Sequence, residues 1–157
     1  MRLFLVQHGN ALPKDVDPER GLSERGEQDV ANVAAFLARG SVQVARIFHS
    51  GKKRAWETAE LFRVCLIGGV NFDERDGIAP LDPVVGVAEE IQNLSMDTMF
   101  VGHLPFMGKL VAHLIVGNED IGVVSFTPGT VVCLERDGND IWSVAWMVKP
   151  ELLKSLS

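Results

Sequence analysis

Two histidines follow short apolar runs, and they are the side chains of this chain best suited to chemistry. His8 comes two residues after the run 3–6, and His103 comes two residues after the run 98–101. An imidazole changes its charge near neutral pH, so it can attack as a nucleophile or transfer a proton. A structural histidine at a strand end would leave the same local pattern, so the surrounding elements have to decide between the two interpretations.

Both runs are typical of strands that are buried on two faces, as in a parallel sheet covered by helices. The carboxyl ends of parallel strands meet at one edge of a sheet, where open α/β sheets bind their ligands. Gly9 lets the backbone turn sharply and approach a ligand closely. We therefore expect both histidines at the same rim of the sheet.

The first half of the chain predicts alternating strands and helices. Ser23 is an N-cap for a helix that runs to about Arg39, with an apolar stripe on one face and Gly40 at its end. A second strand is expected over residues 44–48 and a second helix over about 52–64. This β-α-β-α order predicts parallel strands joined by right-handed crossovers.

The second half is less regular at first and ends in a hairpin. Gly68-Gly69 breaks the pattern, and residues 72–83 hold at most one short strand. Helices are expected over 84–94 and about 105–116, on either side of the strand 98–101, and a short helix or a frayed tail follows Pro150. Two strands, 131–135 and 141–148, flank the turn Asp137-Gly138 as an antiparallel hairpin. The predicted fold class is an α/β/α three-layer sandwich with a mostly parallel sheet, and Trp142, Trp146 and Met147 are expected to pack.

Composition limits the possible functions. The 157 residues are 46% hydrophobic and 23% charged, which suits one domain over residues 1–157. The 15 Lys and Arg against 21 Asp and Glu give a net charge of -6, which argues against a nucleic-acid partner. There is no apolar run of the roughly 18 residues that a membrane span needs, nor a signal-peptide core. Cys65 and Cys133 have no metal-site spacing, so we expect two buried reduced thiols in a cytoplasmic protein.

Four segments, in chain order, resemble the motifs of the histidine phosphatase (phosphoglycerate mutase-like) superfamily. They are 5–11 (LVQHGNA), 20–26 (RGLSERG), 50–59 (SGKKRAWETA) and 101–105 (VGHLP). Each is weak alone, but four at these intervals are specific. The resemblance implies a phosphoglycerate mutase-like fold, and the compact length is most similar to the SixA-type phosphohistidine phosphatases.

The resemblance also implies a mechanism. His8 would attack phosphorus and hold the phosphoryl group as a covalent phosphohistidine, which water then hydrolyses. Arg54 would bind phosphoryl oxygens with its guanidinium fork, next to Gly9 and the start of its helix. His103 would donate to the oxygens where charge concentrates. Arg20 either reaches the same pocket or caps the following helix region, and the mechanism requires no metal or cofactor.

One position departs from the family pattern. The superfamily has Arg immediately before the nucleophile, and this chain has Gln7. The glutamine amide can donate a hydrogen bond to phosphate, but it has neither the positive charge nor the paired donors of a guanidinium. The sequence therefore predicts weakened catalysis or a phosphate-binding relic. Lys14, Lys52 and Lys53 either supply the missing charge or are solvated surface lysines.

Three further residues are candidates for the substrate site. Asp82 is either a proton donor or a helix cap, and His49 follows the second strand at the expected rim. Asn10 lies beside the nucleophile but cannot act as a general acid. A phosphohistidine substrate would relax the need for an acid, because imidazole leaves more easily than an alkoxide.

Two classes of function remain. The first is a phosphatase acting through phospho-His8 on a phosphorylated protein of the histidine phosphotransfer type or on a small phosphorylated molecule, with phosphate or sulfate able to occupy the site. The second is a catalytically impaired binding module for phosphate or phosphoprotein. A mutase is less favoured, since the chain has no extra length to enclose its substrate.

Overall fold

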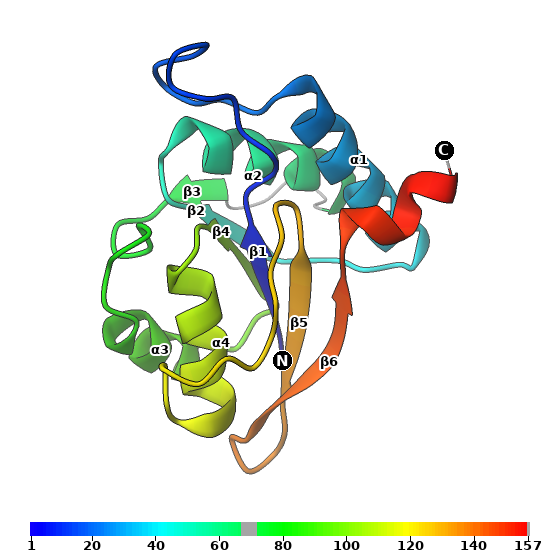
Figure 1. The fold of residues 1–157 in the computed structure, drawn as a ribbon. Helices are drawn as coiled ribbons and strands as arrows, with labels where there is room; N and C mark the ends of the chain where they lie inside the picture. The colour runs from blue at the N-terminus through cyan, green and yellow to red at the C-terminus, as the bar shows by residue number, and fades with distance from the viewer. Residues whose placement is uncertain (67–71, 157) are drawn as a thin grey trace.

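The computed structural model describes residues 1–66 and 72–156, and over these residues the chain forms a six-stranded sheet flanked by helices (Figure 1). The strands are β1 (Arg2–Gln7), β2 (Arg46–His49), β3 (Phe72–Glu74), β4 (Thr98–Gly102), β5 (Val131–Arg136) and β6 (Trp142–Val148). The helices are α1 (Glu24–Arg39), α2 (Lys53–Leu66), α3 (Val85–Gln92), α4 (Phe106–Val116) and the 3-10 helix η1 (Pro150–Leu156). The predicted break at Gly68-Gly69 lies outside the described residues.

The order of the strands, β3-β2-β4-β1-β5-β6, places the three strands that carry the candidate residues next to one another. β1 and β2 both pair with β4 in parallel, and the register sets Gln7 opposite Gly102 and His49 opposite Val101. The carboxyl ends of these strands therefore meet at one edge. β5 and β6 pair antiparallel, which confirms the predicted hairpin.

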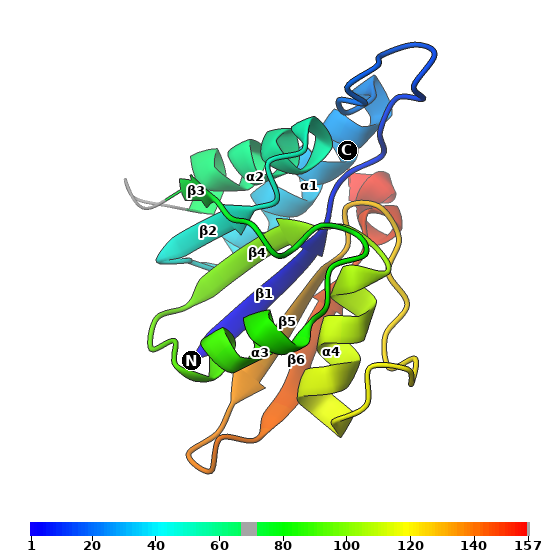
Figure 2. The same cartoon turned by 90° about the vertical axis from the view of Figure 1, so that its left-hand side faces the viewer.

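Helices cover both faces of the sheet, and Figure 2 shows α1 and α2 on one side and α3 and α4 on the other. Alternate residues of β1 serve the two cores: Phe4 and Val6 pack with α1 and α2, whereas Leu3 and Leu5 pack with α3 and α4. Because both faces of β1 are buried, its sequence is a continuous apolar run. The predicted α/β/α sandwich is confirmed.

The first helix has the predicted ends. The Ser23 hydroxyl accepts a hydrogen bond from the Gly26 N–H at 3.0 Å, and Gly40 caps the carboxyl end. The stripe that the sequence predicted is buried against the sheet: Val30, Val33, Ala34 and Leu37. The hydroxyl cap and the stripe together explain why this segment is helical.

Three sequence-based expectations need correction. The second strand begins at Arg46 rather than 44 and includes His49, because Val44 packs into the core before pairing with β4 begins. Val84, not Asp82, is the N-cap of α3, and no side chain caps that end. Cys65 is exposed near the end of α2, at the margin of the face that buries Ala55, Ala59 and Phe62, whereas Cys133 is buried as predicted.

Among the described residues, no helix combines the length and the apolar character that crossing a bilayer requires.

Candidate active site

Two loops and one helix start bring imidazoles and a guanidinium together at the edge of the sheet. His8 follows β1, His103 follows β4, and Arg54 lies in the first turn of α2. The rings of His8 and His103 are 5.0 Å apart between centroids, and Arg54 Nε lies 3.3 Å from His8 Nε2. These three residues, predicted from separate motifs, thus share one site.

The hydrogen bonds of His8 fix its tautomer. Nδ1 lies 2.7 Å from the Gly9 carbonyl oxygen, which can only accept, so the ring proton is on Nδ1. Nε2 then has a free lone pair, and it accepts from Arg54 Nε. Burial lowers the pKa of His8 to about 4 against the opposing effect of the Gly9 bond, and the charges of Arg54 and Arg20 lower it further. His8 is therefore neutral at pH 7, and its unprotonated Nε2, which accepts from Arg54, is the ring nitrogen suited to attack an electrophile.

This low pKa predicts how the free protein responds to acid. We expect the His8 ring to titrate near pH 4 in an NMR experiment, rather than near 6.5. Between these two values the unfolded chain binds a proton that the folded chain does not, so stability falls as the pH falls through this window. A His8 midpoint close to 6.5 would contradict the buried, cation-flanked environment described above.

Ser50 is hydrogen-bonded to the second histidine. Its hydroxyl lies 2.6 Å from His103 Nε2 and also accepts weakly from the Lys52 backbone N–H at 3.4 Å. Burial lowers the pKa of His103 to about 3, and the charges of His8, Arg54 and Lys52 act in the same direction. His103 is therefore a neutral imidazole at pH 7. It can donate only one proton to a substrate oxygen.

Thr58 links the loop that carries His8 to α2. Its hydroxyl accepts from the Gly9 N–H at 2.9 Å and donates to the Arg54 carbonyl at 2.8 Å. A Cβ on Gly9 would lie 2.7 Å from a methyl group of Val30, so only glycine allows this approach. The loop that carries His8 is thus tied to the helix that carries Arg54.

We expect Thr58→Val to destabilise the protein by about 1–3 kcal/mol, because the buried Gly9 N–H loses its acceptor. Thr98→Val is a matched control, since Thr98 is also buried but donates to the carbonyl of exposed Met96, which water can satisfy. Urea unfolding of both variants measures the difference. Equal losses in the two variants would show that the Gly9 contact contributes nothing of its own.

Asn10, two residues after His8, is hydrogen-bonded to Ser23 at the start of α1. Its side-chain oxygen accepts from the Ser23 hydroxyl at 2.7 Å, and its carbonyl accepts from the Ser23 N–H at 2.9 Å. A Cβ on Gly26 would lie 2.1 Å from the same carbonyl, so glycine in the first turn of α1 permits this contact. The amide of Asn10 thus links the His8 loop to α1.

Gln7 is almost fully buried, at 8% exposure, in the last position of β1. Its backbone pairs with the loop before β5 through Thr130 and Gly129. The side-chain Oε1 is buried and has no hydrogen-bond partner in the described part of the chain. Buried polar atoms without a hydrogen-bond partner are uncommon in folded proteins.

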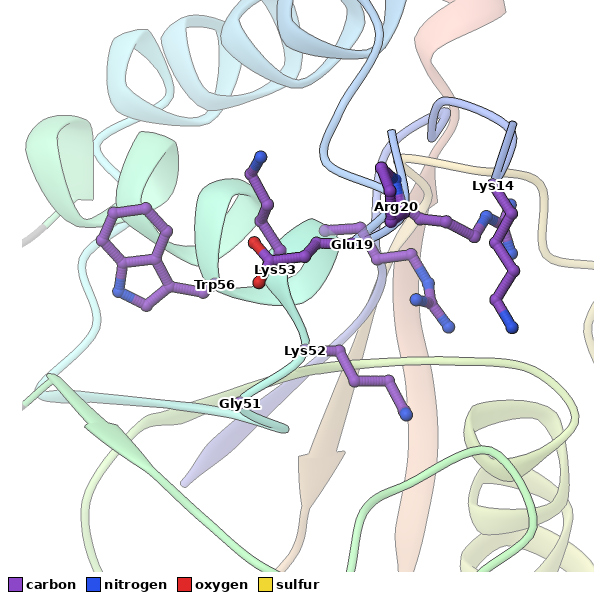
Figure 3. A pocket seen from close by; sticks show the side chains of 9 residues that line it. Lys14, Glu19, Arg20, Gly51, Lys52, Lys53 and Trp56 are labelled. Atoms are coloured by element: carbon purple, nitrogen blue, oxygen red, sulfur yellow. The ribbon is translucent and has the colours of Figure 1, made fainter. Parts of the chain in front are cut away.

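A cavity of about 460 Å³ opens beside Arg54 (Figure 3). Arg20 lines it, so this residue reaches the pocket and does not cap α1, whose cap is Ser23. Its Nε donates to the Leu12 carbonyl at 3.1 Å, and its backbone has a left-handed φ of 53°. The remaining lining residues come from the same loop and from the start of α2: Lys14, Pro18, Glu19, Gly51, Lys52, Lys53, Arg54 and Trp56.

Two predicted substrate residues lie apart from the three central groups. The His49 ring packs on Phe72, and its Nδ1 accepts from the Gly51 N–H at 3.2 Å. Asp82 accepts from the Ala79 N–H at 2.8 Å and lines a second hollow of about 530 Å³ on the other side of Ser50. Within the described residues, no carboxylate is hydrogen-bonded to His8, His103 or Arg54.

Ser50 and Thr58 belong to the segment 50–59, and the sequence alone assigns neither of them a role. Their contacts to His103 and Gly9 join residues 53 and 49 positions apart in the chain. The signal that could have found them was their fixed spacing from Arg54 in the motif. No group of three or more His, Cys, Asp and Glu side chains that could hold a metal ion occurs in residues 1–66 and 72–156.

Comparison with known proteins agrees with this geometry. Residues 3–75 match the model of the histidine phosphatase superfamily, branch 1. The protein histidine phosphatase SixA complexed with tungstate superposes with a TM-score of 0.85 at 27% identity, over 98% of this chain and 100% of the other. A SixA-type structure from Agrobacterium tumefaciens gives 0.76 at 19% identity, over 95% and 97% of the two chains. A mycobacterial glucosyl-3-phosphoglycerate phosphatase complexed with VO3 gives 0.70 at 15% identity, over 92% and 97%.

The similarities to the Agrobacterium tumefaciens structure and to the mycobacterial phosphatase, both below 25% identity, show the fold alone. No curated protein matches the chain by sequence. Residues 3–75, a little under half of the chain, are thus similar to the histidine phosphatase superfamily, and the likeness to the SixA structure extends over almost the whole chain. The structure that the chain follows along almost its whole length is that of the protein histidine phosphatase SixA.

Proposed function

We propose that this protein is a phosphatase that works through a covalent phosphohistidine on His8. The observation that carries the proposal is the arrangement of the His8 ring: its Nδ1 is bound to the Gly9 carbonyl, and its unprotonated Nε2 faces the Arg54 guanidinium. This geometry suits attack on an anionic electrophile, because the cation that binds the substrate lies beside the attacking atom.

The reaction has two steps. In the first, the Nε2 lone pair forms a bond to phosphorus while the bond from phosphorus to the leaving group breaks. In the second, water attacks phosphorus, the N–P bond breaks, and phosphate leaves with His8 restored. Arg54 and the backbone N–H groups at the start of α2, whose first turn has no acidic residue, stabilise the phosphoryl oxygens. His103 donates its single proton to the same oxygens.

Protein phosphohistidine is the substrate class that the site favours. With no carboxylate bonded to the central groups, the site has no evident general acid for an alkoxide leaving group. An imidazole leaving group needs less help from an acid than an alkoxide does, because a phosphorylated imidazole ring is readily protonated by solvent. The SixA structure that this chain resembles is a protein histidine phosphatase and holds tungstate, which supports phosphate or sulfate as a ligand here. A small phosphorylated molecule with a good leaving group would react in the same way.

A non-catalytic phosphate-binding module is the second candidate, and Gln7 is the observation that favours it. The uncharged amide stands where the superfamily has Arg, so the site has one cation fewer to stabilise the transition state.

Transfer of label from a phosphodonor separates the two. We expect radiolabelled phosphoramidate to give a protein adduct on His8 that is stable to alkali and labile to acid. A screen of phosphorylated substrates that includes phosphoramidate should then show turnover. A protein that binds phosphate but acquires no label, with no turnover on any substrate, would be the binding module.

A further inference from the structure

Positive charge is concentrated in the cavity beside Arg54 to a degree that the phosphoryl site alone does not require. Five of the chain's 15 Lys and Arg residues line it, together with one carboxylate, that of Glu19. The chain as a whole has a net charge of -6. An anion that binds among several cations is attracted by all of them at once, so this cavity suits an anionic ligand.

Three of these cations already have defined contacts. Arg54 donates to His8 and belongs to the phosphoryl site. Arg20 is anchored to the Leu12 carbonyl. Lys53 forms an ion pair with Asp17 at 3.1 Å, and in Figure 3 its amino group turns away from the cavity.

Lys14 and Lys52 are different. Neither amino group has a hydrogen bond or an ion pair with any described residue, and Figure 3 shows both side chains directed toward the same open space. Lys52 is near enough to the phosphoryl site for its charge to lower the pKa of His103. The two lysines come from different segments, the loop after β1 and the start of α2, so they approach the cavity from two sides.

The cavity is open to solvent and, at about 460 Å³, is larger than one phosphoryl group needs. A phosphoryl group bound by Arg54 would fill a small part of this space and would leave the region between Lys14 and Lys52 open.

We propose that Lys14 and Lys52, with Arg20, form a second anion subsite that binds a carboxylate or phosphate group of the substrate beside the phosphoryl site. The proposal rests on the proposed function, because the first anion is the phosphoryl group that His8 receives. Its consequence is specificity: the preferred substrate has a second anionic group close to the transferred one.

Three phosphonates that cannot transfer a phosphoryl group test the subsite by calorimetric titration. Methylphosphonate has one anionic group, phosphonoacetate adds a carboxylate, and methylenebisphosphonate adds a second phosphonate. We expect at least one of the last two to bind the wild-type protein about tenfold more tightly than methylphosphonate, the lower end of what a charge-assisted hydrogen bond contributes. The tighter of the two identifies the chemistry of the second group.

The double variant Lys14→Gln/Lys52→Gln should lose this preference, with the ratio of dissociation constants falling close to one. Lys149→Gln, a lysine that follows β6 away from the cavity, is the matched control and should keep the wild-type ratio. Equal affinities in the wild type, a ratio that survives in the double variant, or a ratio lost equally in Lys149→Gln would each overturn the subsite.

Failure of the proposed function gives a different result. Binding of these phosphonates needs no turnover. A protein that acquires no label on His8 but shows the lysine-dependent preference would support the subsite and contradict the phosphatase proposal. A labelled protein without the preference would support the phosphatase proposal and contradict the subsite.

Discussion

His8→Gln is expected to reduce turnover to the uncatalysed background. The variant has no ring nitrogen to form the N–P bond, so the covalent intermediate cannot exist. Loss of the nucleophile in a well-characterised hydrolase costs on the order of 10⁶-fold in kcat. The measurable decrease in kcat cannot exceed the ratio of the kcat of the parent, which has Gln7 in its site, to the uncatalysed rate.

The experiment measures both kcat and label transfer, with phosphate binding as a third readout. Binding should persist in His8→Gln, since Arg54 and the start of α2 still provide donors. His113→Gln, on α4, is the control and should keep both turnover and label. Turnover in His8→Gln within about tenfold of the parent would show that another group attacks phosphorus, because so small a loss is far below that of a missing nucleophile.

Gln7→Arg is expected to raise kcat by about 10²–10³-fold, the effect of one pre-organised donor in an oxyanion site. Gln7 ends β1 directly before the nucleophile, and its buried Oε1 has no partner in the described residues. A guanidinium there would add a charge and a fork of donors aimed at the phosphoryl oxygens. The same change should lower stability without phosphate, because a third guanidinium joins Arg54 and Arg20.

Two further variants separate charge from geometry. Gln7→Lys adds charge without the fork and should give a smaller gain than Gln7→Arg. Gln7→Met has a similar length but no donor and should be slower than the parent. Steady-state kinetics on phosphoramidate provides the ranking Arg, Lys, Gln, Met. If Gln7→Arg is no faster than the parent on any phosphoryl substrate, the residue before the nucleophile does not limit catalysis in this chain.

Most helices and strands could be predicted from the sequence, because the patterns that indicate them involve residues close together in the chain. The Ser23 cap, the buried stripe of α1 and the Asp137-Gly138 turn each depend on residues a few positions apart. Element ends were less accurate, as at β2, where a core contact by Val44 resembles the start of a strand. The exposure of Cys65 could not be predicted from its residue type, because the rotation of α2 about its own axis decides which side chains face the sheet.

Substrate residues were harder to predict, because placement at a strand end does not say which way a side chain faces. His49 and His8 both stand where strands end, yet His49 packs on Phe72 while His8 meets Arg54. Asp82 had two local interpretations, and the structure gives it a third, as the acceptor for the Ala79 N–H.

What the sequence by itself determined is the set of reactive side chains and the strand ends that carry them, since burial on both faces leaves a continuous apolar run that stops where the polar rim begins. The tertiary structure decided the chemical state of those side chains. The free Nε2 of His8, the contact from Arg54 and the clamp from Thr58 join residues about fifty positions apart. Such distances depend on β4 lying between β1 and β2 and on how α2 packs, and no local pattern encodes either.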